Sequence, residues 1–362
     1  MLNKLESLRG IAACLVVIYH SRFNYGDAPI TFIHNSYLFV DLFFILSGFV
    51  MALAYNDKIT NNFPFKTYLT LRLGRIYPLH AFMLFTWLIY LIALYLMGFS
   101  GTEQLTNPDY SFFSNLLLSQ SMGLHNMNTW NEPSWSISTE FYAYIAFFWI
   151  SIFFDKKKTL FVPLIISVGC YLFLISLERD SLHITYDFGF FRCLGAFYLG
   201  VFLYRLKKIN LLNSWATNKI NALEVISITF TVFSVSIAEQ SPYFFIFPIM
   251  SFMLIIWVFS NDNNGQLGQL FNSRVLRKIG QWSYSIYLLH WLICNVSGRF
   301  FEGVLGLDAD ASLGGYSLLI NALLLLITIV LSKFSYQYIE MPSRDFSKKY
   351  AYRIKKKVIS TI

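Results

Sequence analysis

Charged residues are scarce in this 362-residue chain, at 13% of the composition, whereas apolar residues make up 56%. Soluble domains carry about 25% charged residues, so a water-exposed fold of this length has too few polar side chains to cover its apolar surface. No long polar block separates the apolar runs, which are each about twenty residues long. The sequence therefore predicts one integral membrane domain, with no soluble catalytic domain at either end and no removable signal peptide.

The common cofactor and metal motifs are absent as well. The four cysteines lie singly in apolar runs, without a CxxC pair or a Cys/His cluster, so neither a disulfide framework nor a metal site is predicted. The chain contains no GxGxxG, Walker or HExxH string, and no permanently bound cofactor is expected. The net charge of +8 does not indicate nucleic-acid binding, because the basic residues occur in short segments between apolar runs.

Ten apolar ranges predict an all-α integral membrane protein, a bundle of about ten transmembrane helices. Basic and acidic loops alternate, and the basic set includes both ends of the chain. By the positive-inside rule both termini are predicted to be cytoplasmic, which requires an even number of spans. Residues 1–345 then form the transmembrane domain and residues 346–362 a basic cytoplasmic tail. The predicted spans are residues 8–27, 37–55, 72–98, 134–154, 159–177, 187–205, 220–238, 242–260, 280–297 and 315–338.

Ionisable residues inside the spans cost about 2.5 to 3.5 kcal/mol each on insertion scales, so each needs a partner or a function. His20, Glu140 and His290 belong to three different spans. At 1.5 Å per residue they lie roughly 18, 20 and 15 Å above the cytoplasmic face. An acid and two histidines at one depth suit general acid–base catalysis. The alternative for each histidine, and for His80 in the third span, is a buried ring satisfied by a backbone carbonyl.

Three arginines gather at the cytoplasmic ends of two predicted spans. Arg72 and Arg75 have the spacing i, i+3 and therefore share one helical face. Arg9 lies on the same side, eleven residues before His20. Ordinary positive-inside flanking with snorkelling side chains is one interpretation. The other is a site for a polyphosphate ligand, since arginine binds phosphate through several directed donors.

Four further residues are candidates for binding an acceptor. Asp41 and Arg192 lie at similar distances inside two spans, and a structural ion pair is equally open for them. Ser134 and Trp135 follow the external loop 99–133, which is either a binding loop or a solvated connector. The glycines inside spans, which predict close helix packing, are Gly48, Gly195 and Gly200.

Six segments of the chain resemble, in order, the signatures of the membrane acyltransferases called the acyltransferase-3 family. In that family an arginine precedes a histidine by eleven positions, as Arg9 precedes His20 here. The final segments resemble the family's last two signatures. The six segments are residues 5–13 (LESLRGIAA) with His20, 39–49 (FVDLFFILSGF), 72–78 (RLGRIYP), 133–142 (PSWSISTEFY), 284–290 (YSIYLLH) and 338–342 (YIEMP).

The resemblance implies a stand-alone bacterial enzyme of the cytoplasmic (inner) membrane. Such an enzyme moves an acyl group, with acetyl as the default, from acyl-coenzyme A to a hydroxyl of a cell-surface or lipid-linked saccharide. Arg9, Arg72 and Arg75 would hold the donor, which is a substrate and not a resident cofactor. His20 would act as general base, while Glu140 or His290 orients it or positions the sugar. An acyl-histidine relay is a variant of this mechanism.

The expected partners are therefore acyl-CoA, a saccharide acceptor and the lipid bilayer, and the sequence does not indicate an oligomeric state. Two other classes also have many spans and buried charges: glycan flippases or polymerases, and transporters. Neither consumes acyl-CoA or needs an arginine cluster at the cytoplasmic mouth. Transporters often contain an inverted repeat, and this sequence shows no clear internal repeat.

Overall fold

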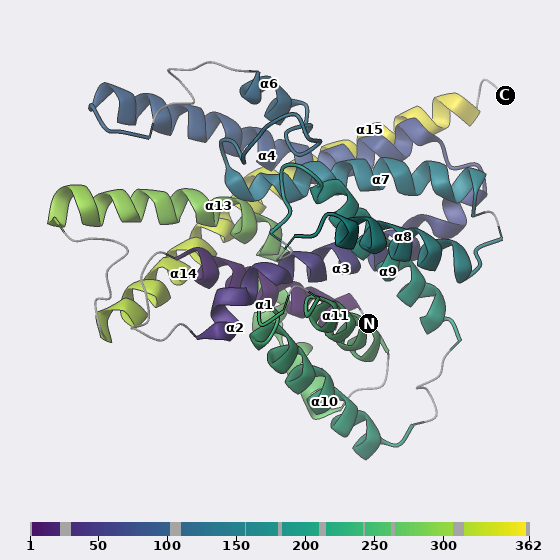
Figure 1. Cartoon of the computed structure of the whole chain (residues 1–362). Coiled ribbons are helices and arrows are strands. Elements are labelled where there is room, and N and C mark those ends of the chain that lie inside the picture. The colour runs from purple at the N-terminus through teal and green to yellow at the C-terminus, as the bar shows by residue number, and fades with distance from the viewer. Residues whose placement is uncertain are drawn as a thin grey trace.

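The computed structural model describes residues 2–21, 30–101, 110–155, 157–179, 183–209, 215–241, 243–261, 265–306 and 315–359. Every regular element within these residues is helical, which confirms the all-α prediction (Figure 1). The elements, in chain order, are α1 (Leu2–His20), α2 (Thr31–His34), η1 (Asn35–Leu38), α3 (Phe39–Thr60), α4 (Phe65–Leu96), α6 (Ser111–Leu116), η2 (Glu132–Ser134), α7 (Trp135–Phe153), α8 (Phe161–Ser176), α9 (Gly189–Lys207), α10 (Thr217–Ser236), α11 (Ile246–Phe259), α12 (Gln266–Phe271), α13 (Arg274–Leu305), α14 (Gly315–Ser335), the π-helical η3 (Tyr336–Glu340) and α15 (Met341–Ile359).

Within the described residues, six helical segments are long and apolar enough to cross a membrane, as an integral membrane protein requires. Helices α8 and α11 are also apolar but shorter, at 16 and 14 residues. All ten predicted ranges overlap helices, while the number of ten spans and the cytoplasmic position of both termini stay predictions. The six segments are Thr31–Thr60, Phe65–Leu96, Glu132–Phe153, Gly189–Lys207, Thr217–Ser236 and Tyr316–Arg353.

Two helix boundaries differ from the predicted spans in ways that affect the site. Helix α1 ends at His20, where the Ser21 hydroxyl donates back to the Ile18 carbonyl at 2.7 Å; the predicted end at residue 27 lies outside the described residues. Helix α4 begins at Phe65, directly after Pro64, and not at residue 72. The first turns of α4 are too polar to satisfy a hydropathy criterion, so the predicted start came too late. Arg72 therefore lies two turns inside the helix.

Helix α1 is less apolar than most of the spans because protein, more than lipid, surrounds it. It lies near the centre of the bundle, against α13 and α3 (Figure 1). Its polar side chains find partners there: the buried Lys4 ammonium donates to the Asn261 carbonyl at 2.6 Å, and the Ser7 hydroxyl donates to the Phe271 carbonyl at 2.6 Å. A helix enclosed by protein does not need an apolar surface all round.

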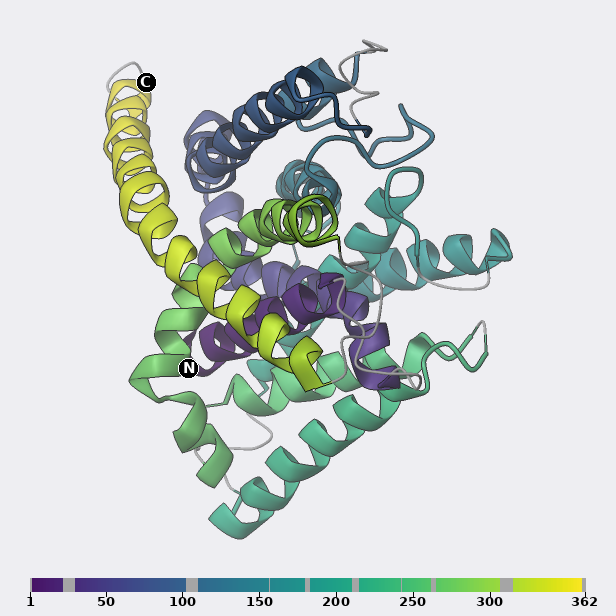
Figure 2. The same ribbon diagram turned by 90° about the vertical axis from the view of Figure 1, so that its left-hand side faces the viewer.

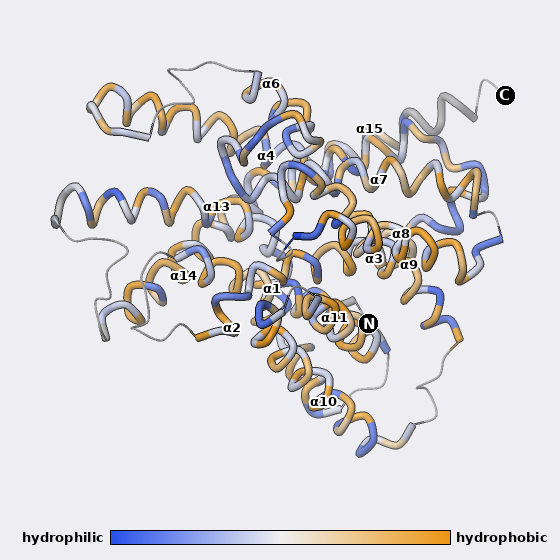
Figure 3. Tube along the Cα trace, viewed as in Figure 1, coloured by the Kyte–Doolittle hydropathy of each residue, from blue (hydrophilic) through white to orange (hydrophobic). Residues whose placement is uncertain are grey.

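Apolar residues are frequent along the peripheral helices (Figure 3), and many of their side chains are exposed. On α4, Ile89 and Leu96 are 68% and 77% exposed, and on α14 Leu318 and Leu319 are similarly open. Apolar side chains exposed to this extent are suited to lipid.

The C-terminal helices run along one side of the molecule. Helices α14 and α15 follow one another through η3, and α15 packs lengthwise against α4 (Figure 2). A π-helical turn of this kind is rare and is frequently found at functional sites. Its last residue, Glu340, is buried, and its side chain accepts a hydrogen bond from the Ser285 hydroxyl at 2.5 Å.

Candidate active site

The crossing of α1 and α13 determines where the two predicted catalytic histidines lie. A Cβ on Gly10 would lie 2.7 Å from the Gly280 nitrogen, and a Cβ on Gly280 would lie 2.0 Å from the Glu6 carbonyl oxygen. Only glycines allow the two backbones to come this close. Ten residues further along each helix, about 15 Å at 1.5 Å per residue, His20 meets His290. The helices therefore run parallel and in register from the glycine contact to the histidine contact.

The hydrogen bonds of the histidine pair assign the position of each proton. His290 Nδ1 lies 2.6 Å from the Tyr287 carbonyl oxygen, so this nitrogen carries hydrogen and donates. In neutral His290, Nε2 is then an acceptor, and it lies 3.2 Å from His20 Nδ1. The Val16 carbonyl oxygen is also 3.0 Å from His20 Nδ1. Both neighbours are acceptors, so His20 carries its proton on Nδ1 and its Nε2 presents a lone pair.

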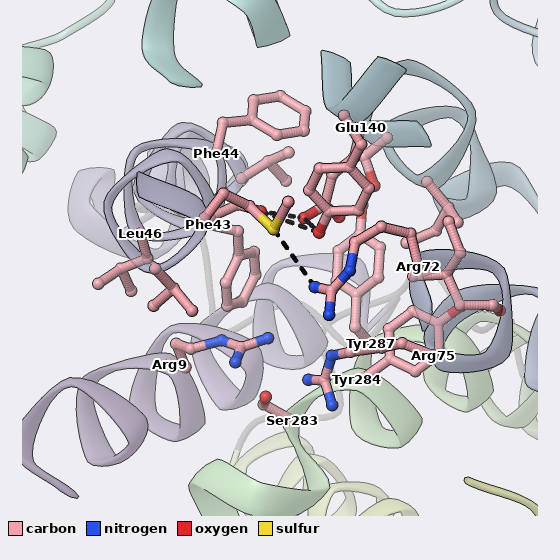
Figure 4. A pocket seen from close by; sticks show the side chains of 18 residues that line it. Arg9, Phe43, Phe44, Leu46, Arg72, Arg75, Glu140, Ser283, Tyr284 and Tyr287 are labelled. Atoms are coloured by element: carbon pink, nitrogen blue, oxygen red, sulfur yellow. Dashed lines mark hydrogen bonds between the residues drawn. The ribbon is translucent and has the colours of Figure 1, made fainter. Parts of the chain in front are cut away.

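The three arginines singled out by the charge pattern line one cavity, and neither His20 nor His290 is among its lining residues. Arg9 comes from α1, and Arg72 and Arg75 come from α4. Their guanidinium groups turn toward one another across the cavity (Figure 4). Arg72 donates to the Tyr55 hydroxyl at 2.8 Å, while its buried Nε has no hydrogen-bond partner. Among the described residues, the carboxylate ion pairs of the protein are made elsewhere, and none involves these three arginines.

Glu140 lies on the opposite wall of the same cavity (Figure 4). Its Oε1 accepts hydrogen bonds from the Ser47 hydroxyl and, at 2.5 Å, from the Tyr144 hydroxyl. The hydrogen bonds of Glu140 therefore go to α3 and to its own helix, and none of those in the described part of the chain joins it to either histidine. The structure brings His290 against His20, and it places Glu140 with the arginines.

Aromatic residues of α13 connect the cavity with the histidines. Tyr287 lines the cavity through its ring, while its backbone carbonyl accepts the hydrogen bond from His290. The Tyr287 hydroxyl accepts a hydrogen bond from the Ser136 hydroxyl at 2.8 Å and donates to the Pro133 carbonyl at 3.0 Å. Pro133 and Ser136, at the start of the fourth predicted span, thus fix the position of Tyr287. The cavity, of about 80 Å³, is also lined by apolar side chains such as Phe43 and Phe44.

Asp41 and Arg192 form a buried ion pair between α3 and α9. Arg192 donates through Nε to Oδ1 at 3.0 Å and through Nη2 to Oδ2 at 2.7 Å, and both side chains are at most 1% exposed. Its guanidinium also lies 5.3 Å from the centre of the Trp135 ring. The positive charge of Arg192 also acts on His183, in the segment before α9. Burial lowers the pKa of His183, and the nearby Arg192 lowers it further. The geometry supports the structural interpretation of this pair.

Glycines bring α3 and α9 together at this pair, as predicted. A Cβ on Gly48 would lie 1.8 Å from the Phe197 carbonyl oxygen, and one on Gly200 would lie 1.9 Å from the Ile45 carbonyl oxygen. Gly195 similarly admits the side chains of α8, with Cys170 Cβ at 3.2 Å. Larger residues at these positions would separate Asp41 from Arg192.

Ser134 and His80 have the contacts of structural residues. The Gln120 side chain donates to both the carbonyl and the hydroxyl of Ser134 at 3.1 Å. His80 is buried, with Nε2 2.8 Å from the Asn115 carbonyl oxygen. These contacts pack the described part of loop 99–133 against the start of α7. Neither Ser134 nor Trp135 lines the arginine cavity, although the next two residues do.

Sequence reasoning did not single out several polar residues that the structure places at this cavity. Ser47 and Tyr144 share the Glu140 oxygen, and Ser283 and Tyr284 line the wall formed by α13. Glu340 lies within electrostatic reach of Arg75 and Arg9. Ser47, Tyr284 and Glu340 occur within segments that carried the family resemblance, which was the available signal.

Comparison with known proteins shows which family the chain belongs to. A family model described as an acyltransferase domain, Acyl_transf_3, matches residues 2–335. A Bacillus subtilis (strain 168) protein named "Putative peptidoglycan O-acetyltransferase YrhL" is 23% identical over 94% of this chain and 54% of its own length. A Staphylococcus aureus (strain COL) protein named "Putative O-acetyltransferase SACOL0978" is 23% identical over 94% of this chain and 57% of its own length.

A Rhizobium radiobacter protein, "Protein 2 in picA locus", is 41% identical over 26% of this chain and 48% of its own length. The chain spans about half the length of these curated relatives. No solved structure matches it. Since the family model covers nearly the whole chain, this protein belongs to the acyltransferase-3 family.

Proposed function

We propose that this protein transfers an acyl group, acetyl in the first instance, from acyl-CoA to a hydroxyl of a cell-surface or lipid-linked saccharide. The observation that carries the proposal is the cavity on which Arg9, Arg72 and Arg75 converge. Such a cluster of cations requires an anionic occupant, and coenzyme A carries phosphates at one end and the reactive thioester at the other. Arginine is well suited to these phosphates because its guanidinium presents several donors in a fixed geometry.

The donor would enter from the cytoplasm of a bacterial cell, where coenzyme A is present. This requires the arginine side of the bundle to face inward, in line with the positive-inside prediction and the ten-span topology. The uncharged arm would then lie along the apolar wall formed by Phe43 and Phe44. The names of the relatives, one of which specifies peptidoglycan, support acetyl as the acyl group and a glycan as the acceptor.

His20 would act as the general base in this reaction. With its proton fixed on Nδ1 by His290 and the Val16 carbonyl, its Nε2 accepts the proton of the acceptor hydroxyl. The hydroxyl oxygen attacks the thioester carbonyl, and the resulting tetrahedral intermediate collapses with loss of the coenzyme A sulfur. His20 returns the proton to that sulfur, so the products are an ester and a free thiol.

His290 takes the orienting role in this scheme, since it contacts His20 directly. Glu140, held by Ser47 and Tyr144, faces the arginines and is proposed to position them and the donor. Asp41, Arg192, Ser134 and Trp135 would support the acceptor side indirectly, through the buried packing described above.

The test is thioester cleavage by the purified protein in lipid nanodiscs, with acetyl-CoA and a candidate glycan. We expect free thiol to appear only when both substrates are present, and acetylated glycan to appear in equal amount by mass spectrometry. A glycan flippase or a transporter would move its substrate without releasing thiol. Thiol release that depends on neither His20 nor the arginines would refute the proposal.

A further inference from the structure

A second and larger cavity opens next to the arginine cavity. It has a volume of about 570 Å³ and lies between the end of α3, the start of α4 and α15. Arg72 and Arg75 line both cavities, so the two meet at these residues. The second cavity therefore adjoins the proposed donor site through these two arginines.

Positive charge dominates the second cavity. Its lining includes five cationic side chains and one carboxylate, Asp57. That carboxylate already has partners on the neighbouring loops, because Lys158 Nζ lies 2.7 Å and Lys208 Nζ 3.9 Å from its oxygens. Lys348 Nζ also lies 3.3 Å from an Asp345 carboxylate oxygen, and the remaining excess of positive charge is available to a ligand. The five cations are Lys58, Arg72, Arg75, Arg344 and Lys348.

Aromatic side chains stand among these charges. The lining contains Tyr55, Phe63 and Tyr352. Tyr55 lies under two cations, with the Arg72 guanidinium 4.8 Å and the Lys58 ammonium 5.3 Å from the centre of its ring. Aromatic rings beside arginines are the combination that holds a nucleobase by stacking and its phosphates by charge.

Helix α15 supplies the outer wall of this cavity. Arg344, Lys348 and Tyr352 follow one another at intervals of four residues, so they share one helical face that extends about 12 Å. The helix is close to α4 because Gly74 leaves room for it: a Cβ there would lie 1.7 Å from the Ser347 hydroxyl. Arg344 lies within electrostatic reach of Arg75 and Arg72.

We propose that the second cavity binds the adenosine 3′,5′-bisphosphate end of the donor, with Arg344 and Lys348 of α15 contacting the 3′-phosphate. The assignment rests on the proposed acyl-CoA function and adds a binding role for α15. The diphosphate would lie at the junction formed by Arg72 and Arg75. The smaller cavity then receives the uncharged pantetheine arm along its apolar wall. The five cations of the second cavity match the three phosphate groups at this end of the ligand.

The decisive comparison uses two donors that differ by one phosphate, acetyl-CoA and acetyl-3′-dephospho-CoA. For the unaltered protein we expect KM to be about tenfold or more lower for acetyl-CoA, the usual effect of losing a hydrogen-bonded charge. Arg344→Ala and Lys348→Ala should raise KM for acetyl-CoA and leave KM for the dephospho donor and kcat nearly unchanged. Arg344→Lys should recover part of the loss.

Lys349→Ala is the matched control, because Lys349 is the next residue on the same helix, is exposed and does not line the cavity. It should leave KM for both donors unchanged. If Arg344→Ala and Lys348→Ala affect both donors equally, or affect neither, the assignment of α15 is wrong.

A direct binding measurement separates this proposal from the acyl-transfer proposal. Adenosine 3′,5′-bisphosphate should bind the unaltered protein more tightly than adenosine 5′-monophosphate, and Arg344→Ala should abolish the difference. Binding without any turnover would refute the acyl-transfer function and leave the nucleotide site standing. Turnover without such binding would overturn the nucleotide site. The nucleotide site would also be overturned if the nucleotide binds in nanodiscs of phosphatidylcholine but not at all in nanodiscs of phosphatidylglycerol. In that case a lipid phosphate occupies the cavity.

Discussion

The contact between Gly10 and Gly280 allows a specific test of how the histidines are positioned. It lies about 15 Å from His20 and His290 and involves neither of them. In Gly280→Ala the new Cβ would lie 2.0 Å from the Glu6 carbonyl oxygen. An ordinary contact between these atoms is about 3.3 Å, so α1 must withdraw by roughly 1.3 Å. If α1 moves as a rigid helix, the 3.2 Å separation of His20 Nδ1 and His290 Nε2 grows to about 4.5 Å, beyond hydrogen-bonding distance.

The expected result is a loss of about 100-fold in acyl-transfer rate, the typical effect of a 1 Å displacement of a catalytic group. Overpacking should also cost about 1 to 3 kcal/mol of stability. The measurements are initial rates of thiol release and of glycan acetylation in nanodiscs, together with thermal unfolding followed by circular dichroism. Gly10→Ala, whose Cβ would lie 2.7 Å from the Gly280 nitrogen, is a milder change and should give an intermediate rate.

Gly169→Ala is the control, since Gly169 lies within α8 and a Cβ there meets nothing within 4 Å. It should keep full activity, and its helix should gain up to about 1 kcal/mol from the better propensity of alanine. Full activity in a well-folded Gly280→Ala protein would refute the view that this crossing positions the histidines.

Three further predictions follow from the site. His20→Ala should lower the acyl-transfer rate by about 10² to 10⁴-fold with normal folding, and an unchanged rate would exclude His20 as the base. His290→Gln, which places an acceptor near the position of Nε2, should keep more activity than His290→Asn, which keeps only the donor to the Tyr287 carbonyl; the reverse order in kcat would contradict the assigned proton positions. Asp41→Asn should destabilise the protein by about 3 to 5 kcal/mol, because it removes the carboxylate charge that balances the buried Arg192 guanidinium. Asp41→Leu combined with Arg192→Met should restore much of this loss in a thermal unfolding assay, and a double variant as unstable as the single one would argue against a purely structural pair.

The three residues predicted to act together show where sequence reasoning succeeded and where it stopped. His20 and His290 were expected at similar depth, and they are in contact. Glu140 was expected with them, but its hydrogen bonds go to Ser47 and Tyr144. Depth follows from the rise of 1.5 Å per residue, whereas the direction in which a side chain points depends on how each helix is rotated about its axis. A predicted span contains no information about that rotation.

The arginines illustrate the same limit. Their spacing and their position at the ends of spans indicated a shared face and a phosphate site, and Arg9, Arg72 and Arg75 do line one cavity. Residues 346–362 were predicted to be a basic cytoplasmic tail. Lys348 of this range lines the second cavity together with Arg344, because helix α15 packs along α4. Nothing local in the sequence indicates that packing, apart from a glycine at position 74 facing a serine at position 347.

The amino-acid sequence by itself determined that this protein is helical and embedded in a membrane, since hydropathy and helix length are properties of consecutive residues. Through its ordered motifs it also determined the family. Only the tertiary structure decided which side chains meet: His20 with His290, Glu140 with Ser47 and Tyr144, and Asp41 with Arg192. These contacts depend on how closely two helices can approach each other and on the register between them. That is a property of pairs of residues far apart in the chain, such as Gly10 and Gly280.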